Sequence, residues 1–349
     1  MRVGSLCTGI AGLELGLQMA GINTEPVFVS DIDKGANEWL AANMADVPNL
    51  GDFTALDELP EVDIITAGFP CQPVSTAGRR AGINDERWLF DDITRLTSRM
   101  ESRPLLFVEN VPGLLTANGS DAMARVVYGL ASIGYHITWG TLPAAAVGAP
   151  HRRNRWWGLA YPADSDSEST GRHAGTVLRT QEPRRGLSDN TNRPTHGSGT
   201  RTTPDADITS SEARLDTGHW GERVRAQPLG HPTSTADADD ARRSEHGRTV
   251  PARTELSPIE RPCPNPERFG QWAPAVAQWE TILGRRAPDP TDGNRLNPAF
   301  VEWMMGYPAG WVTDTLERRT LSLYALGNAV VPQCAAQAFT QLTTRLPWT

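Results

Sequence analysis

Over the first 161 residues, short apolar runs alternate with segments in which apolar residues recur at helical spacing. Short runs rich in Val, Ile and Leu are typical of buried strands, and spacings of three and four are typical of helices. The predicted strands cover 3–6, 27–30, 63–67, 105–108, 136–141 and 156–160, and the predicted helices cover 13–20, 36–43, 91–100 and 122–133. This alternation predicts an α/β fold: a doubly wound, mostly parallel sheet with helices on both faces.

The pattern changes after residue 162. Residues 163–262 are rich in Asp, Ser, Thr, Arg and Gly, have almost no apolar periodicity, and repeat Asp-X-Asp at irregular intervals. We interpret this segment as a low-complexity insertion, extended or disordered, and not as a series of metal sites.

Helical spacing returns at 269–283 and 298–305, and residues 323–339 predict a turn that leads into a helix. The chain is therefore expected to divide into a sheet domain, an irregular region and a C-terminal part that packs back on the sheet domain from about residue 321. The corresponding ranges are 1–161, 162–294 and 295–349.

Composition limits the class of protein only broadly. Hydrophobic residues make up 39% and charged residues 21% of the chain, an ordinary balance for a folded domain. The sequence contains no run of about 18 apolar residues, so we predict no membrane span. The N-terminus lacks the apolar stretch of a signal peptide. We therefore expect a cytoplasmic protein. The four cysteines lack metal-binding spacing, so no metal is predicted.

The formal net charge of −8 is weak evidence against a nucleic-acid partner. Lys34 is the only lysine, however, so nearly all the basic charge is arginine, which is the side chain best shaped for phosphate and guanine contacts. A GC-rich genome would produce the same bias. Charge alone leaves the partner open.

A glycine-containing turn, 7–12, follows the first predicted strand and precedes a helix. Its glycines allow a ligand to approach the backbone, and the N-terminus of the helix favours an anionic group. The turn is not G-x-G-x-x-G, which counts against a dinucleotide, whereas a nucleoside carrying an amino-acid carboxylate fits. Asp31 or Asp33 could take ribose hydroxyls, and Asp52 an adenine amino group. Each of these carboxylates could equally be a helix cap.

Three further strand ends carry residues suited to catalysis. Cys71, in Gly-Phe-Pro-Cys-Gln-Pro, is expected to face the crevice at the carboxyl end of the sheet and could be a nucleophile beside positive charge. Glu109, at the end of the next strand, could have a raised pKa and donate a proton to a ring nitrogen. Arg153 and Arg155 alternate onto one side of an extended chain, either as a solvated basic turn or to orient substrate and thiolate.

In combination and in order, Pro-Cys-Gln, Glu-Asn-Val, Arg-X-Arg and Gly-Asn-Ala-Val-Val resemble the motifs of the C5-cytosine DNA methyltransferase family over 1–161 and 295–335. The resemblance implies a Rossmann-like S-adenosylmethionine-dependent methyltransferase fold with a smaller, irregular target-recognition domain at 162–294. It implies that Cys71 attacks C6 of a flipped-out cytosine in double-stranded DNA, that Glu109 supports the attack at N3 and the exocyclic amine, and that Arg153 and Arg155 hold the base and the catalytic loop.

The same resemblance implies a cofactor site and a mobile DNA-binding loop at 72–90. The implied S-adenosylmethionine contacts are Thr8, Gly9, Ile10, Gly12, Leu13, Asp31, Ile32, Asp52, Phe53, Pro70 and Asn328. The implied loop contacts to DNA are Gln72, Ser75, Arg79, Arg80 and Arg87. We expect a monomer that serves restriction-modification or phage DNA protection, with a cognate restriction endonuclease acting separately.

Two positions depart from the family pattern: Cys7 stands where Phe is common, and His151 where Gln is usual. Neither removes a catalytic group. The branch of the family that acts on tRNA carries a Cys-Phe-Thr signature, which is missing here, and an inactive DNA-binding relative would not be expected to retain Cys71, Glu109 and Arg153 together. An exocyclic-amine methyltransferase would need an Asp/Asn/Ser-Pro-Pro-aromatic motif instead.

Overall fold

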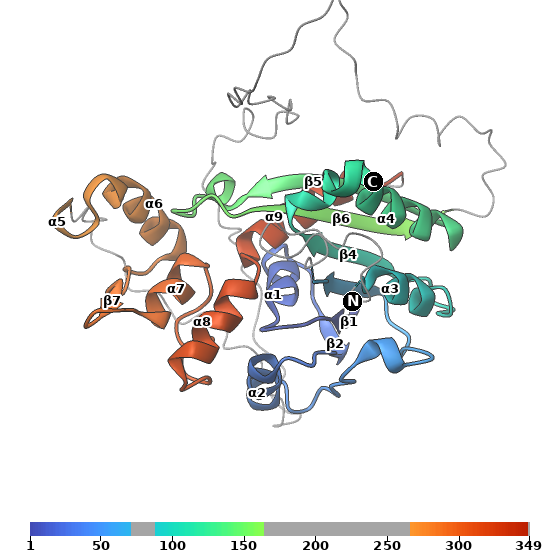
Figure 1. Ribbon diagram of the computed structural model, residues 1–349, viewed down its shortest axis with the longest axis horizontal. Helices are drawn as coiled ribbons and strands as arrows, with labels where there is room; N and C mark the ends of the chain where they lie inside the picture. The colour runs from blue at the N-terminus through green and yellow to red at the C-terminus, as the bar shows by residue number, and fades with distance from the viewer. Residues whose placement is uncertain (71–87, 164–265, 348–349) are drawn as a thin grey trace, which may run out of the picture. The chain divides into compact units, whose positions relative to one another are not determined.

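The computed structural model describes residues 1–70, 88–163 and 266–347. Its main feature is a six-stranded sheet in the order β2-β1-β3-β4-β6-β5 (Figure 1). The strands are β1 (Arg2–Leu6), β2 (Glu25–Phe28), β3 (Ile64–Gly68), β4 (Leu105–Asn110), β5 (Tyr135–Pro143) and β6 (Asn154–Pro162). β1 to β4 pair in parallel, whereas β6 runs antiparallel to both β4 and β5. The predicted doubly wound, mostly parallel sheet is confirmed.

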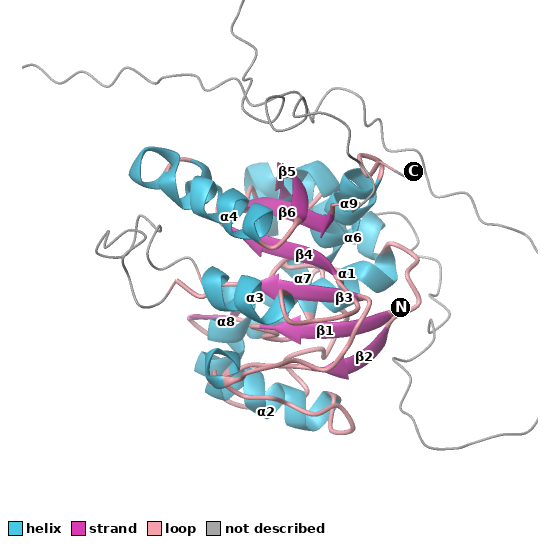
Figure 2. Ribbon diagram, turned by 90° about the vertical axis from the view of Figure 1, so that its right-hand side faces the viewer, coloured by secondary structure: helices cyan, strands magenta, loops and turns pink. Residues whose placement is uncertain are grey.

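Helices lie on both faces of this sheet (Figure 2). The helices between the strands are α1 (Gly12–Met19), α2 (Lys34–Asn43), α3 (Phe90–Thr97) and α4 (Asp121–Ser132). The C-terminal part contributes α5 (Pro266–Phe269), α6 (Ala273–Leu283), the short strands β7 (Thr291–Asp292) and β8 (Arg295–Leu296), α7 (Pro298–Met304), α8 (Arg319–Asn328) and α9 (Pro332–Thr343). In the described part of the chain, no helix is long and apolar enough to cross a membrane.

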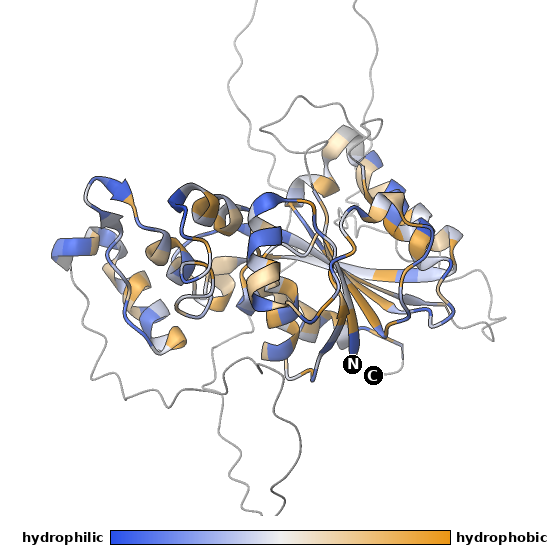
Figure 3. Ribbon diagram, turned by 90° about the horizontal axis from the view of Figure 1, so that it is seen from below, coloured by the Kyte–Doolittle hydropathy of each residue, from blue (hydrophilic) through white to orange (hydrophobic). Residues whose placement is uncertain are grey.

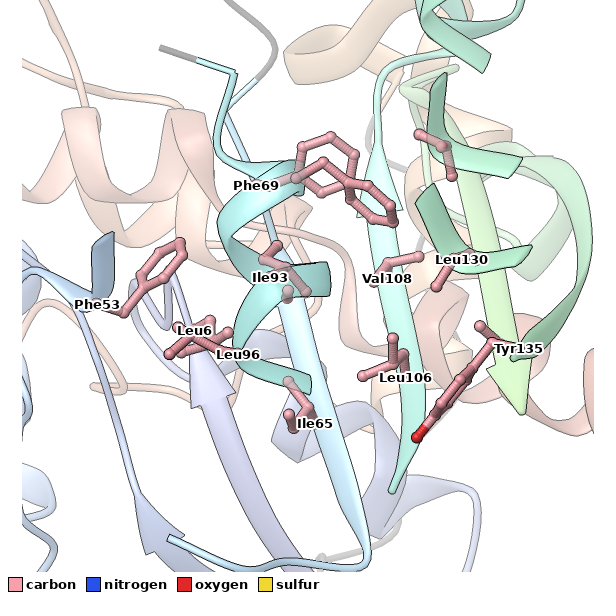
Figure 4. Packing of buried hydrophobic residues seen from close by; sticks show 14 of the residues in the cluster. Leu6, Phe53, Ile65, Phe69, Ile93, Leu96, Leu106, Val108, Leu130 and Tyr135 are labelled. Atoms are coloured by element: carbon pink, nitrogen blue, oxygen red, sulfur yellow. The ribbon is translucent and has the colours of Figure 1, made fainter. Parts of the chain in front are cut away.

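One face of the sheet packs against α3 and α4. Because successive side chains of a strand point to opposite faces, alternate residues such as Ile65 and Leu106 form one buried surface. Ile93 and Leu96 of α3 and Leu130 of α4 cover it, and all are fully buried (Figure 4). Figure 3 shows the apolar residues gathered in the central strands.

The opposite face packs against α1 and α9, two helices from the two ends of the chain that lie side by side in Figure 1. A Cβ on Gly16 of α1 would lie 2.4 Å from the Cβ of Ala335 in α9, so the two helices approach this closely because residue 16 is glycine. Phe107 of β4 contacts Phe339 of α9 with ring centroids 5.2 Å apart. The C-terminal helix therefore completes the core of the sheet.

The C-terminal end of the chain differs from the sequence expectation. The turn and helix expected at 323–339 are two helices, α8 and α9, which Pro332 separates. Pro332 has no backbone N–H and restricts the residue before it, so α8 ends and α9 restarts with proline in its first turn. The expected low-complexity segment lies, from residue 164 to 262, outside the described residues.

Candidate active site

The cofactor turn, residues Cys7–Ala11, connects β1 to α1 and is held against the end of β2. Thr8 exchanges hydrogen bonds with Ser30, whose N–H donates to Thr8 Oγ1 at 3.1 Å and whose carbonyl accepts from the Thr8 N–H at 3.2 Å. The Gly9 N–H donates to Asp31 Oδ2 at 2.7 Å. The structure thus brings the predicted cofactor residues of two adjacent strand ends together.

The turn has an open side suited to an anionic group. Ala11, which precedes α1, makes no side-chain cap bond in the described chain, so the first N–H groups of the helix are not capped by it. A Cβ on Gly9 would meet no described atom within 4 Å. Ile10, Gly12 and Leu13, by contrast, are buried in the packing of α1.

The two candidate aspartates after β2 have different partners. Asp33 caps α2, accepting from the Gly35 and Ala36 N–H groups at 2.8 and 3.0 Å. Asp31 instead binds the cofactor turn, and burial raises its pKa above the ordinary value. Ile32 between them is 71% exposed, which leaves an apolar side chain free to pack on a ring.

Asp52, the third predicted cofactor aspartate, follows only an isolated β-bridge between Val29 and Asn49, and its side chain is partly occupied by local contacts. Asp52 Oδ1 accepts from the Thr54 N–H at 3.0 Å and from Thr54 Oγ1 at 2.7 Å, starting the 3-10 turn Phe53–Ala55. Phe53 is buried in the core. The set of Asp31, exposed Ile32 and the open side of Gly9 fits a nucleoside that carries an amino-acid group, as S-adenosylmethionine does.

The predicted nucleophile and the predicted DNA-binding loop belong to a segment that the structure does not describe. Six predicted site residues lie outside the described residues: Cys71, Gln72, Ser75, Arg79, Arg80 and Arg87. The chain before this segment is fixed: the Asn110 side chain donates through Nδ2 to the Phe69 carbonyl at 3.2 Å, and the Phe69 ring packs on Trp88 and Phe90. Pro70 is exposed at the end of this anchored stretch.

Glu109 lies beside this anchored stretch, because it pairs in register with Gly68 at the end of β3. Glu109 is buried, with its side chain 10% exposed, and Arg155 Nε lies 2.8 Å from Oε1. Burial raises the pKa of Glu109, while Arg155 and then Arg153 oppose that rise. Burial thus favours the protonated carboxyl and the two arginines favour its ionised form, so this group is suited to exchange a proton with a ligand.

Arg153 points toward the C-terminal part of the chain. Its Nη2 donates to the Gly327 carbonyl at 2.9 Å and also to the Ala329 carbonyl, so it clasps the backbone on both sides of Asn328. Asn328, the last residue of α8, is exposed. Burial lowers the pKa of Arg153 to about 10. Its buried Nε has no hydrogen-bond partner among the described residues.

His151, the departure just before the arginines, contacts the C-terminal part as well. Its Nε2 lies 3.0 Å from the Met304 carbonyl at the end of α7, and burial lowers its pKa. A neutral ring with the proton on Nε2 satisfies this contact.

Several residues near the site had no role in the sequence interpretation. Glu14 of α1 is buried and accepts from Thr66 Oγ1 of β3, and burial raises its pKa. Tyr307 and Trp311, after α7, reach Val330 and the cofactor turn. The only sequence signal was the Gly-Tyr-Pro that follows a predicted helix. In the part of the chain that the structure describes, no cluster of three or more His, Cys, Asp or Glu could hold a metal ion.

The fold is that of a Rossmann-like methyltransferase. The S. pombe Dnmt2 methyltransferase superposes with a TM-score of 0.52 at 16% identity, covering 99% of each chain. The Entamoeba histolytica methyltransferase EhMeth gives the same TM-score at 14% identity, covering 99% of this chain and 98% of its own.

The sequence model of the family described as C-5 cytosine-specific DNA methylase matches residues 1–344, and the chain belongs to that family. Type II methyltransferase M2.BsuMI of Bacillus subtilis is 36% identical over 159 residues, which are 44% of this chain and 40% of that protein. Type II methyltransferase M.CviJI of a Paramecium bursaria Chlorella virus is 37% identical over 171 residues, 48% of this chain and 45% of that protein. Each match spans less than half the length of the curated relative.

Proposed function

We propose that this protein is a DNA (cytosine-5-)-methyltransferase that uses S-adenosylmethionine to methylate C5 of a cytosine within a specific double-stranded DNA sequence. The observation that carries the proposal is the buried Glu109–Arg155 pair, in register with Gly68 and next to the anchored Phe69. A proton-holding carboxyl at the entry of a Pro-Cys loop is what attack on a pyrimidine ring requires. Family membership and the Type II relatives support the choice of DNA cytosine.

In this proposal the target cytosine is flipped out of the duplex and Cys71 is the nucleophile. The Cys71 thiolate forms a bond to C6, and the ring electrons move toward C5 while Glu109 donates at N3. Arg155 orients the Glu109 carboxyl and Arg153 holds the neighbouring backbone. S-adenosylmethionine, when bound, would supply the electrophilic methyl group that C5 takes, and the broken sulfur–methyl bond would leave S-adenosylhomocysteine. The C5 proton then leaves to a base, the C5–C6 double bond re-forms, and the Cys71 sulfur departs from C6 as thiolate. Glu109 takes back the proton from N3.

The cofactor is proposed to bind across three strand ends. The Cys7–Ala11 turn and the N-terminus of α1 would hold the amino-acid part, and Asp31 would take ribose hydroxyls. Ile32 would pack on adenine. The remaining proposed contacts are Thr8, Gly9, Ile10, Gly12, Leu13, Asp52, Phe53, Pro70 and Asn328.

The DNA is proposed to be bound by the loop after Cys71 and by the region 162–294. The proposed loop contacts are Gln72, Ser75, Arg79, Arg80 and Arg87. We further propose that the enzyme is a cytoplasmic monomer, that 1–161 and 295–349 form its catalytic part, and that it acts in restriction-modification or phage DNA protection, with a restriction endonuclease as a separate partner.

The decisive test is methyl transfer from labelled S-adenosylmethionine to mixed-sequence DNA, followed by bisulfite sequencing. We expect label at C5 of cytosine with the wild-type protein and none with Cys71→Ala. Cys334→Ala is the matched control, because Cys334 is buried in α9 and its pKa is raised to about 12, which keeps it a thiol. Label in tRNA alone, or a folded protein that labels neither nucleic acid, would refute the proposal.

A further inference from the structure

The cofactor turn has a backbone conformation that its own residues do not favour. Cys7 and Ala11 have φ of +53° and +56°, in the left-handed region that residues with a Cβ rarely adopt. Such a conformation persists only where surrounding contacts hold it in place. The Thr8–Ser30 and Gly9–Asp31 bonds tie the turn to the chain that follows β2. Within the turn, the Ala11 N–H donates to the Thr8 carbonyl at 3.0 Å. None of these bonds holds the Ile10 carbonyl.

Trp311 supplies that contact. Its indole Nε1 donates to the Ile10 carbonyl at 2.9 Å, across 301 positions of sequence. This carbonyl belongs to the residue immediately before Ala11, where the backbone turns left-handed into α1. The bond therefore holds the turn at its entry to the helix.

Trp311 is itself fixed from two sides. The Trp39 indole N–H donates to the Trp311 carbonyl at 2.5 Å, and the two rings lie 5.3 Å apart between centroids. The Tyr307 ring stacks on the Trp311 ring, with the two centroids 6.1 Å apart. These contacts give the indole a single position from which its N–H reaches Ile10.

A buried carboxylate fixes the backbone around Trp311. Glu302 of α7, which is 1% exposed, accepts from the N–H groups of Gly310, Val312 and Thr313 at 2.8, 2.7 and 3.0 Å. Hydrogen bonds from backbone N–H groups to a buried carboxylate are among the stronger ones in proteins. The segment that presents the indole is thus anchored to α7.

Tyr307 reaches the same junction from the other side of α1. Its hydroxyl donates to the Val330 carbonyl at 3.0 Å, and a Cβ on Gly12 would lie only 2.2 Å from that hydroxyl oxygen. Gly12 is therefore the residue that lets Tyr307 pack against the first turn of α1. The Tyr307–Trp311 segment contacts both the turn and the helix start.

We infer that Trp311 is a positioning residue for the cofactor turn: its indole N–H holds the Ile10 carbonyl, so that the turn is already in its binding conformation before S-adenosylmethionine arrives. This inference rests on the proposed function for the identity of the ligand. A turn that is already ordered binds its ligand more tightly, because no conformational entropy of the turn is lost on binding. The anchor is Glu302, so the C-terminal part of the chain sets the shape of an N-terminal site.

The test compares Trp311→Phe with Trp279→Phe in the full-length protein. Phenylalanine keeps an aromatic ring beside Trp39 and Tyr307, but it removes the N–H donor and shortens the ring system. The control variant therefore carries the same truncation. Trp279 is the matched control, since its buried indole N–H donates to the Trp303 carbonyl at 3.0 Å and makes no hydrogen bond to the cofactor turn in the part of the chain that the structure describes. We would measure the Kd of S-adenosylmethionine by calorimetry, the Tm, and amide hydrogen exchange of peptides covering 7–12 in the cofactor-free protein.

We expect Trp311→Phe to raise the Kd about three- to tenfold, the range expected for one lost hydrogen bond, and to speed exchange at 7–12. Trp279→Phe should lower the Tm while leaving the Kd and this exchange unchanged. A Trp311→Phe protein with lowered Tm but wild-type Kd and wild-type exchange would overturn the inference. If the wild-type protein binds no S-adenosylmethionine, the proposed function fails, and the exchange at 7–12 still decides whether Trp311 holds the turn.

Discussion

Arg155 Nε lies 2.8 Å from Glu109 Oε1, in a pair whose side chains are only 21% and 10% exposed. The contact exists because β6, which carries Arg155, runs antiparallel beside β4, which carries Glu109. Burial raises the pKa of Glu109, and Arg155 is the largest influence in the opposite direction. The arginine therefore sets how readily the carboxyl gives up its proton.

Replacing Arg155 by methionine should raise the pKa of Glu109 further. Loss of one adjacent positive charge is typically worth about 1–3 in pKa for a carboxyl group. We expect the limb of the pH–rate profile that reports deprotonation of Glu109 to move to higher pH in single-turnover methyl transfer. Arg152→Met is the control, since Arg152 is exposed. An unshifted limb in Arg155→Met would mean that the pair does not control the proton.

Arg153→Lys tests whether Arg153 holds the backbone beside Asn328 or contacts the reacting base. The guanidinium reaches the carbonyls of Gly327 and Ala329, whereas an ammonium on a single stem cannot match that fork. Because the clasped backbone flanks Asn328, we expect the KM for S-adenosylmethionine to rise about tenfold, for a loss of about 1.4 kcal/mol, with a smaller change in kcat. A fall in kcat at unchanged KM would instead assign Arg153 to the reacting base.

The sheet could be predicted from the sequence because its signal is local. Apolar runs such as 63–67 and 105–108 predict buried strands, and parallel pairing then brings the carboxyl ends of these strands together. The proximity of Gly68 and Glu109 follows from this pairing. Parallel pairing of β1 and β2 likewise places the cofactor turn beside the end of β2.

Contacts between distant parts of the chain could not be predicted in the same way. Arg153 bonds to carbonyls 174 and 176 positions away, and no periodicity encodes a side chain's choice of backbone acceptor. The choice between Asp31 and Asp33 was equally hidden, because both follow the same strand and only the chain path shows that Asp33 caps α2. Glu14 was missed because α1 is buried on nearly all sides, between β3 and α9, so its polar residue does not mark a solvent face.

Glu14→Gln should change the pH dependence of stability. The folded pKa of Glu14 is raised by burial, so the folded state holds this proton more tightly than the unfolded chain. The penalty for ionising Glu14 is absent below its unfolded pKa and grows as pH rises through the window up to the folded pKa. We expect the free energy of unfolding of Glu14→Gln, relative to wild type, to rise between pH 5 and pH 8. Urea denaturation at both pH values measures it, and a difference that is the same at both would contradict it.

Asn110→Asp should impair the nucleophile without affecting the cofactor. The buried Asn110 amide donates through Nδ2 to the Phe69 carbonyl at 3.2 Å, while its Oδ1 accepts from the Val111 N–H at 2.8 Å. Aspartate keeps the acceptor and removes the donor, so the chain entering the Cys71 loop loses its anchor. Because small displacements of a reacting group can cost about a hundredfold in rate, we expect covalent trapping on 5-fluorocytosine DNA to slow about ten- to hundredfold, with the Kd of S-adenosylmethionine unchanged. Asn43→Asp is the control for loss of an asparagine donor at an exposed position. It removes hydrogen bonds to the Trp39 carbonyl at 2.9 Å and to Thr315 Oγ1 at 3.0 Å, and it should trap at the wild-type rate. Equal slowing in both variants, or wild-type trapping by Asn110→Asp, would show that the Phe69 carbonyl need not be held for Cys71 to react.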